Sequence, residues 1–297
     1  MTLRWRHMTD DERERAYSPS SCLADGDYRP FVEAYRQRSD RAWSRLAETS
    51  CRTATVRYGD AASQTVDVVV PPHADEAPPM LIFFHGGYWQ ELSKADSRFA
   101  AWDCVQRGWA FAAVDYTLAP LASVPEIIEE CRRARRTLHR EAATLGFDPT
   151  RIFVTGSSAG AHLAAMVATD PGGPADPVRG AVLVSGIFDL EPLIGTSIDA
   201  ALALDAATAA EYSPLRLDTA GFPATVIAYG ADETSEFKAQ SEAFARALRD
   251  TGTTSSTLEV PGRNHFDVIL DLAAPNTVLG DATTELIETH GSRHADL

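Results

Sequence analysis

Short apolar runs alternate with amphipathic segments along most of the chain. Continuous runs of hydrophobic residues at 80–84 and 110–114 predict strands that are covered on both faces, as in parallel sheets. Further strands are expected at residues 66–70, 151–155, 181–184, 224–229 and 257–260. Apolar residues recur at helical spacing in the intervening segments 125–143, 159–169 and 235–248. This alternation predicts an α/β fold built from βαβ units, with a mainly parallel, doubly wound sheet and helices on both faces.

Two segments lie outside the alternation of strands and helices. Residues 1–50 are polar with a helical pattern, and residues 190–220 stand between two predicted strands. We therefore expect residues 1–297 to form a single domain with an N-terminal helical segment and a small cap-like insertion. The Ala-rich stretch 199–210 is expected to be a helix of that cap. Because open α/β sheets bind ligands at the carboxyl ends of their strands, both segments are suited to cover that edge.

Composition and charge exclude several classes of protein. The 297 residues are 44% hydrophobic and 23% charged, which is typical of a globular domain. A net charge of −15 argues against a nucleic-acid or anionic-membrane partner, since phosphate binding needs a basic surface. No apolar run approaches the ~18 residues of a membrane span, and the N-terminus lacks the apolar core of a secretory signal.

The spacing of the cysteines indicates the redox environment of the protein. Cys22, Cys51, Cys104 and Cys131 are widely spaced, without a Cys-x-x-Cys pair. Reduced thiols in a cytoplasmic protein are therefore expected, rather than a disulfide framework or a zinc site.

The motif G-x-S-x-G occupies residues 156–160, with Ser158 at its centre and Ser157 beside it. It lies between a predicted strand and a predicted helix, which is the context that a nucleophile elbow requires. The sharp turn would raise the Ser158 hydroxyl above the sheet edge, and the helix N-terminus would direct the Ala159 N–H at a reacting carbonyl. The same residues could form a merely structural Gly-rich turn, but the flanking elements favour catalysis.

A second motif, H-G-G-Y-W at residues 85–89, directly follows the buried run 80–84. Gly86 and Gly87 allow the backbone to turn N–H groups toward a developing oxyanion. Together with the Ala159 N–H they predict an oxyanion hole, in which one donor typically contributes about 3–4 kcal/mol. His85 is expected to hold this loop rather than to carry a proton.

A late histidine and a preceding acid would complete a catalytic triad. In this architecture the order is Ser, acid, His, and His265 follows the last predicted strand. Asp232 and Glu233 both follow the strand 224–229, and periodicity does not choose between them. The remaining histidines lie near the termini, in a Pro-rich loop, or on helices: His7, His73, His139, His162, His290 and His294.

Several side chains near these motifs are candidates for substrate binding. They are Ser157, Tyr88, Trp89, His162 on the nucleophile helix, and Phe188. Ordinary core packing is the alternative for each aromatic residue, and is equally expected for Phe188. An aromatic contact contributes about 0.5–1.5 kcal/mol beyond the burial of its area.

These motifs, with further short stretches, resemble the arylformamidase (kynurenine formamidase) family of the α/β-hydrolase fold over nearly the whole chain. The stretches that carry the resemblance are residues 17–19, 85–90, 114–120, 156–163, 185–190, 236–241 and 264–267. The short glycine motifs also occur in esterases that resemble hormone-sensitive lipase. The Tyr88-Trp89 pair and the segment 236–241 are more specific to formamidases.

The resemblance implies a serine hydrolase without metal or cofactor. Its activity would be hydrolysis of the N-formyl amide of an aryl formamide such as N-formylkynurenine, releasing formate, in tryptophan breakdown or a related secondary-metabolite pathway. The family places its acid at Glu233, with Asp232 as the alternative. The partner would be a small-molecule substrate, and a homodimer is compatible with the sequence.

Besides a specialised formamidase or amidase of secondary metabolism that acts on a substituted kynurenine, two rival functions remain at this stage. The first is a carboxylesterase acting on small aryl or short-chain esters, which would use the same triad. The second is a catalytically inactive receptor on the same fold, which the complete set of Ser, acid, His and paired glycines disfavours.

Overall fold

The computed structural model describes residues 4–72, 76–170, 173 and 177–291. Within them an eight-stranded sheet has the order β1-β2-β4-β3-β5-β6-β7-β8. The strands are β1 Arg52–Arg57, β2 Thr65–Val70, β3 Met80–Phe84, β4 Ala110–Val114, β5 Ile152–Ser157, β6 Gly180–Val184, β7 Ala224–Asp232 and β8 Ser255–Asn264. β2 runs antiparallel to β1 and β4, and all other neighbours are parallel. The predicted mainly parallel sheet is confirmed.

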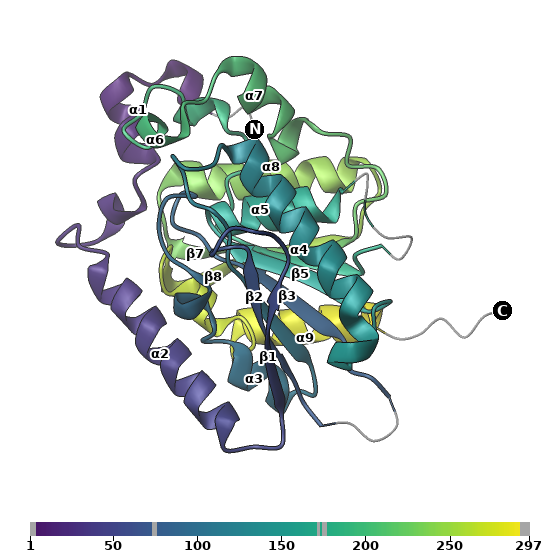
Figure 1. The fold of residues 1–297 in the computed structure, drawn as a ribbon. Coiled ribbons are helices and arrows are strands. Elements are labelled where there is room, and N and C mark those ends of the chain that lie inside the picture. Colours follow the sequence, from purple (N-terminus) through teal and green to yellow (C-terminus); the bar gives the residue numbers. More distant parts are fainter. Residues whose placement is uncertain (1–3, 73–75, 171–172, 174–176, 292–297) are drawn as a thin grey trace.

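Helices cover both faces of the sheet (Figure 1). They include α3 Ala101–Gln106, α4 Val124–Leu145, α5 Ala159–Ala168, α8 Ser235–Asp250 and α9 Val278–His290. Alternate residues of β3 enter two separate cores, because successive strand side chains point to opposite faces. Ile82 and Phe84 pack in one core with α4, α5 and α8, whereas Leu81 and Phe83 pack in the other with α3 and α9.

The N-terminal segment forms helices, as its pattern predicted, and lies beside the sheet. It contains α1 Asp10–Ala16 and α2 Arg29–Ala47, with the 3₁₀ turns η1 Arg4–His7 and η2 Pro19–Cys22. α2 packs against α3 and against the turn η3 Lys94–Ser97, where Arg36 pairs with Asp96 at 3.2 Å. None of the described helices combines the length and apolarity that a membrane crossing requires.

The segment 190–220 contacts the N-terminal segment, so the two lie together over one end of the sheet. It holds the short elements η4 Glu191–Leu193, α6 Asp199–Leu202, α7 Ala206–Glu211 and η5 Pro214–Arg216. Arg6 pairs with Glu191 at 3.0 Å, and the Glu14 carboxylate accepts a hydrogen bond from the backbone N–H of Ser197 at 2.7 Å.

The expectation of one helix across the Ala-rich stretch is wrong. Ala203 adopts a left-handed conformation at φ +50°, which ends α6. Asp205 then caps α7 by accepting a hydrogen bond from the N–H of Thr208 at 2.7 Å. An Asp that caps a new helix competes with helix continuation, so the alanines fall into two short pieces.

Candidate active site

Ser158 stands on a strained turn between β5 and α5. Its φ of +57° and ψ of −122° lie outside the regions that a residue with a side chain prefers. A Cβ on Gly160 would lie 2.0 Å from the carbonyl oxygen of Phe84, and a Cβ on Gly156 would lie 2.3 Å from that of Gly160. The two glycines of the motif therefore allow β3, β5 and α5 to approach closely enough to form the turn.

Behind this turn, a buried carboxylate holds the imidazole of His265. The Glu233 Oε2 lies 3.0 Å from the His265 Nδ1. The other carboxylate oxygen, Oε1, accepts hydrogen bonds from the Ser185 hydroxyl at 2.5 Å and from the Gly230 N–H at 2.6 Å. Because an ionised carboxylate only accepts, Nδ1 must be the protonated nitrogen, and Nε2 carries the lone pair.

The structure separates the two acids that the sequence left open. Glu233 is buried and reaches His265, whereas the neighbouring Asp232 is exposed and lies outside this contact. The choice follows from the turn after β7, because successive residues there point in opposite directions. The resemblance had placed the acid at Glu233, whereas the hydrophobic periodicity carried no such information.

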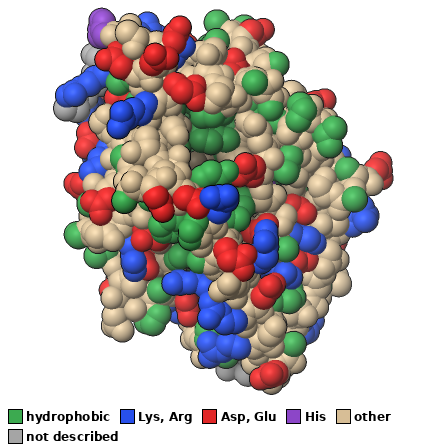
Figure 2. Space-filling view, turned by 90° about the vertical axis from the view of Figure 1, so that its left-hand side faces the viewer, with side chains coloured by type: hydrophobic (Ala, Val, Ile, Leu, Met, Phe, Trp, Pro, Cys, Tyr) green, Lys and Arg blue, Asp and Glu red, His purple; other side chains and the backbone are tan. Residues whose placement is uncertain are grey.

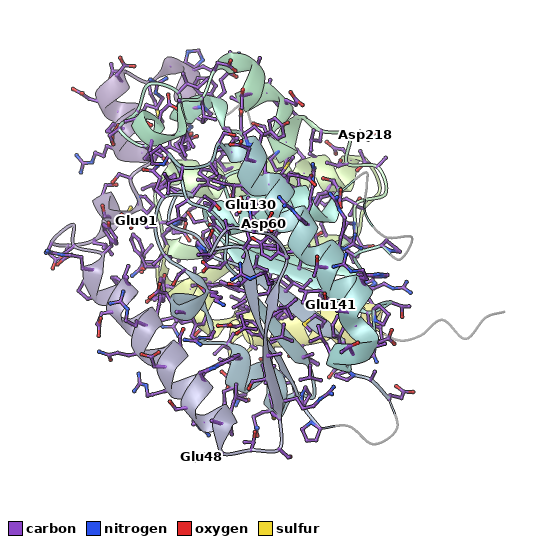
Figure 3. The ribbon with its side chains drawn as sticks, viewed as in Figure 1. Glu48, Asp60, Glu91, Glu130, Glu141 and Asp218 are labelled. Carbon is purple, nitrogen blue, oxygen red and sulfur yellow. The ribbon has the colours of Figure 1, made fainter. Side chains whose placement is uncertain are left out.

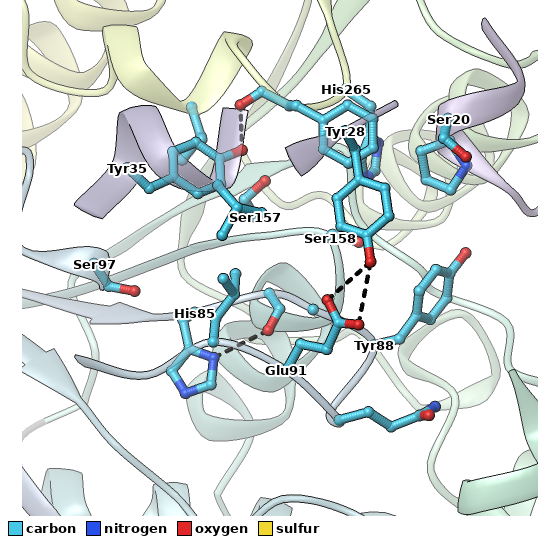
Figure 4. A pocket seen from close by; sticks show the side chains of 18 of the residues that line it. Ser20, Tyr28, Tyr35, His85, Tyr88, Glu91, Ser97, Ser157, Ser158 and His265 are labelled. Atoms are coloured by element: carbon cyan, nitrogen blue, oxygen red, sulfur yellow. Dashed lines mark hydrogen bonds between the residues drawn. The ribbon is translucent and has the colours of Figure 1, made fainter. Parts of the chain in front are cut away.

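Ser158 and His265 line one cavity of about 400 Å³, at the carboxyl end of β3 and β5 (Figure 4). Four further residues that were predicted for the oxyanion hole or for substrate binding line it as well: Gly86, Gly87, Tyr88 and Ser157. The side of the molecule that carries α2 shows hydrophobic side chains gathered near its centre, between acidic and basic groups (Figure 2). The cavity therefore joins a nucleophile, a base and apolar walls.

The glycine loop lies directly against the nucleophile. A Cβ on Gly86 would lie 3.4 Å from the Ser158 Cβ. The Gly86 carbonyl oxygen contacts the His85 Nδ1 at 3.0 Å and accepts from the Tyr116 hydroxyl at 3.4 Å. In a planar trans peptide the N–H points opposite to the carbonyl, so the Gly87 N–H turns away from His85 and Tyr116.

His85 itself is part of the support for this loop. Its ring stacks on that of Tyr116 with centroids 4.1 Å apart, and it is buried.

The backbone N–H groups after β5 differ in whether they are free to bind an oxyanion. The N–H of Ser158 donates to the Val184 carbonyl at 2.8 Å and is thus already used. The next N–H, that of Ala159, is the first of helix α5 and has no intrahelical acceptor.

Three expected substrate contacts are corrected by the structure, since Trp89, His162 and Phe188 do not line the cavity. Trp89 is fully buried and meets His162 edge-on at 5.1 Å. Phe188 stacks on Phe244 with centroids 4.4 Å apart. All three pack into the core, because a loop or helix next to a site directs only some of its side chains toward it.

His162 is a buried, neutral group. Desolvation lowers its pKa to about 4, opposed by the contact of its Nε2 with the Tyr212 carbonyl at 2.8 Å. It lies on the nucleophile helix α5 and joins this helix to the insertion through its contact with Tyr212.

Much of the cavity wall comes from residues that were not predicted to line it. The N-terminal segment contributes Glu14, Ser18, Pro19, Ser20, Tyr28, Val32 and Tyr35. The insertion contributes Ser197 and Ile198, and the loop after β3 contributes Gln90, Glu91 and Leu92. The sequence indicated that both outlying segments cover this edge, but only the path of the chain in space selects their inward-facing residues.

Within the described residues, no group of three or more His, Cys, Asp or Glu is placed to hold a metal ion. His73, which was expected in a Pro-rich loop, and His294, which was expected near a terminus, lie outside the described residues.

Comparisons with known proteins agree with this architecture. A family model described as BD-FAE matches residues 66–174. Kynurenine formamidase from Danio rerio is 33% identical over 296 residues, covering 95% of this chain and 98% of that protein. The Salmo salar protein of the same name is 34% identical, covering 91% and 93%. Esterase LipQ from Mycobacterium tuberculosis is 29% identical, covering 76% of this chain and 59% of that protein.

Solved structures show the same fold. A Silicibacter protein described as a candidate thioesterase superposes with a TM-score of 0.75 at 25% identity, covering 89% of this chain and 98% of that one. An esterase from Pyrobaculum calidifontis gives a TM-score of 0.68 at 20% identity, covering 91% and 95%. With the near full-length relatives above, the chain belongs to the kynurenine formamidase family of α/β-hydrolases.

Proposed function

We propose that this protein is a serine hydrolase that removes the formyl group from aryl formamides of the N-formylkynurenine type. The observation that carries the reaction class is the cavity in which Ser158 and His265 lie together, with Glu233 bonded behind the imidazole. The substrate class is supported by identity of 33–34% to kynurenine formamidases along almost the whole chain.

In the proposed acylation step, the His265 Nε2 takes the proton of the Ser158 hydroxyl as its oxygen attacks the formyl carbon. Glu233 keeps the tautomer and stabilises the imidazolium without taking the proton. The N–H groups of Gly87 and Ala159, with that of Gly86, stabilise the oxyanion. The imidazolium then donates its proton to the aryl amine, which leaves as the C–N bond breaks.

In the second step a water molecule attacks the formyl–enzyme ester. His265 takes one proton of that water, the tetrahedral intermediate collapses, and the proton returns to the Ser158 oxygen as formate leaves. Both steps balance without a metal or a redox partner. Because a formyl group is small, most of the cavity is available to the aryl amine.

The decisive experiment replaces Ser158 by Ala and measures formate release from N-formylkynurenine. We expect turnover to fall by about four orders of magnitude or more, since the nucleophile is lost. Circular dichroism and the melting temperature verify that the variant is folded. A folded S158A variant with turnover near that of the wild type would contradict the proposal.

A carboxylesterase is the second candidate, and the similarity to esterase LipQ favours it. The same triad would act on a small aryl or short-chain ester. Values of kcat/KM for N-formylkynurenine and for p-nitrophenyl acetate separate the two functions. A preference for the ester by orders of magnitude would select the esterase.

For location, we propose the cytoplasm. All four cysteines are free thiols in the structure, and Cys104 and Cys131 are buried, which suits a reducing compartment. Fractionation of cells of the source organism, with an antibody against the protein, tests this proposal.

A further inference from the structure

The charged side chains that line the cavity are all acidic. Among the described residues that form its wall, Glu14 and Glu91 carry carboxylates, and none is Lys or Arg. A substrate that brings a cationic group therefore meets attraction in this cavity, whereas a substrate carboxylate finds no cationic side chain. The two glutamates differ in what already contacts them.

The Glu14 carboxylate is already engaged by the protein. It accepts hydrogen bonds from the backbone N–H and from the hydroxyl of Ser197, and thereby joins α1 to the insertion. Its charge is thus used to hold two segments of the wall together. Glu91 is therefore the carboxylate of the cavity wall that can accept further hydrogen bonds.

Glu91 has spare acceptor capacity. The Tyr28 hydroxyl lies 3.2 Å and 3.3 Å from its two oxygens, and can donate only one proton (Figure 4). A carboxylate offers about four acceptor positions, so most of those of Glu91 remain open. No described Lys or Arg pairs with it, and its side chain is exposed, as suits a group at the mouth of the cavity.

The surroundings of Glu91 suit an ammonium group. The rings of Tyr28 and Tyr88 line the same cavity, and Tyr28 stacks on Phe266 with centroids 5.7 Å apart. A carboxylate with aromatic rings nearby attracts an ammonium by charge, by hydrogen bonds and through the ring faces. Glu91 is also fixed to the glycine loop, because its N–H donates to the Gly87 carbonyl at 3.0 Å. A cation held there is held at a set position relative to the oxyanion hole.

We propose that Glu91 is a specificity residue that binds a primary ammonium group on the amine part of the substrate. This inference rests on the proposed function and narrows its substrate class to aryl formamides with a cationic side chain. N-formylkynurenine carries such a cation, its α-ammonium group. The amine formed by decarboxylation of N-formylkynurenine carries an ammonium group as well. Neutral formanilide does not.

The test is Glu91→Gln, which keeps the size and polarity of the side chain and removes its charge. We expect KM for N-formylkynurenine and for its decarboxylated amine to rise about tenfold, and KM for formanilide to change less than twofold. Glu48→Gln is the matched control, because this exposed carboxylate lies at the far end of α2 from Glu91 (Figure 3). It removes the same charge and should alter none of the three KM values.

An ester pair separates this inference from the proposed function. Glu91→Gln should raise KM for 4-(2-aminoethyl)phenyl acetate and leave that for 4-ethylphenyl acetate unchanged, whichever acyl group the enzyme prefers. An equal change, or none, for the charged and neutral members of each pair would overturn the role of Glu91. If the wild-type enzyme cleaves esters but no formyl amide, the proposed function is wrong. The ester pair then still tests whether Glu91 binds the ammonium group.

Discussion

The Tyr35 hydroxyl donates a hydrogen bond to the backbone carbonyl of Phe266, 231 residues away in the sequence and adjacent to His265. Tyr28 and Phe31, from the same end of α2, stack on the Phe266 ring with centroids 5.7 Å and 5.5 Å apart. The N-terminal helix therefore does more than cover the cavity. It fixes the loop that presents the imidazole.

Replacing Tyr35 by Phe should lower kcat about tenfold and leave KM nearly unchanged. The ring and its packing remain, but the His265 loop loses its bond, and a catalytic group displaced by a fraction of an ångström is less effective. The free energy of unfolding should fall by about 1 kcal/mol, as for one buried hydrogen bond. Steady-state kinetics and urea unfolding measure both effects.

Tyr58→Phe is the matched control for this experiment. The Tyr58 hydroxyl also donates to a backbone carbonyl, that of Asp115 at 2.6 Å, and Tyr58 does not line the cavity. This variant should lose a similar free energy of unfolding and keep its kcat. If both variants lose activity in proportion to stability, α2 has no positioning role.

The two neighbouring acids should respond differently to loss of charge. Glu233→Gln should reduce kcat by about a thousandfold or more, because an amide no longer stabilises the imidazolium and its own N–H can hold the wrong tautomer. Asp232→Asn should stay within twofold of the wild type, since Asp232 is exposed and outside the contact with His265. A loss of activity confined to Asp232→Asn would reassign the acid.

The sequence predicted the parts of this fold that are buried on both sides. β3 and β4 are apolar throughout, and every residue in them is buried. β1 escaped prediction because it forms the sheet edge, where five of its six residues are exposed and the side chains are Arg, Thr and Ala. A strand that contributes little to the core leaves little hydrophobic pattern.

The candidate site likewise contains residues that the sequence could predict and residues that it could not. Ser158, the glycines and His265 follow from motifs whose order and context are local. The contact between Glu233 and His265 depends on how a turn directs adjacent side chains, and Tyr35 reaches the site from a helix 231 residues away from Phe266. Trp89 belongs to a motif that lines the cavity, and yet its own side chain points into the core. Residue type alone carries none of this information.

The buried His162 should make the protein less stable in mild acid. Its folded-state pKa of about 4 lies below the ordinary 6.5, so between these values the unfolded chain binds the proton more readily. The free energy of unfolding should therefore fall as the pH drops from above 6.5 toward 4. The linkage relation gives a loss of roughly 2–3 kcal/mol between pH 7.5 and 4.5 from this one group.

Replacing His162 by Gln isolates this contribution, because Gln can still donate to the Tyr212 carbonyl but does not titrate. Urea unfolding at pH 7.5 and 4.5 should show a smaller loss of stability on acidification in H162Q than in the wild type, by roughly 2–3 kcal/mol. The same substitution at the exposed His7 serves as the control. Removal of a solvent-exposed histidine should leave the pH dependence of the free energy of unfolding as it is in the wild type. A loss in H162Q as large as that in the wild type would show that other groups govern the acid sensitivity, and that burial of this imidazole has little part in it.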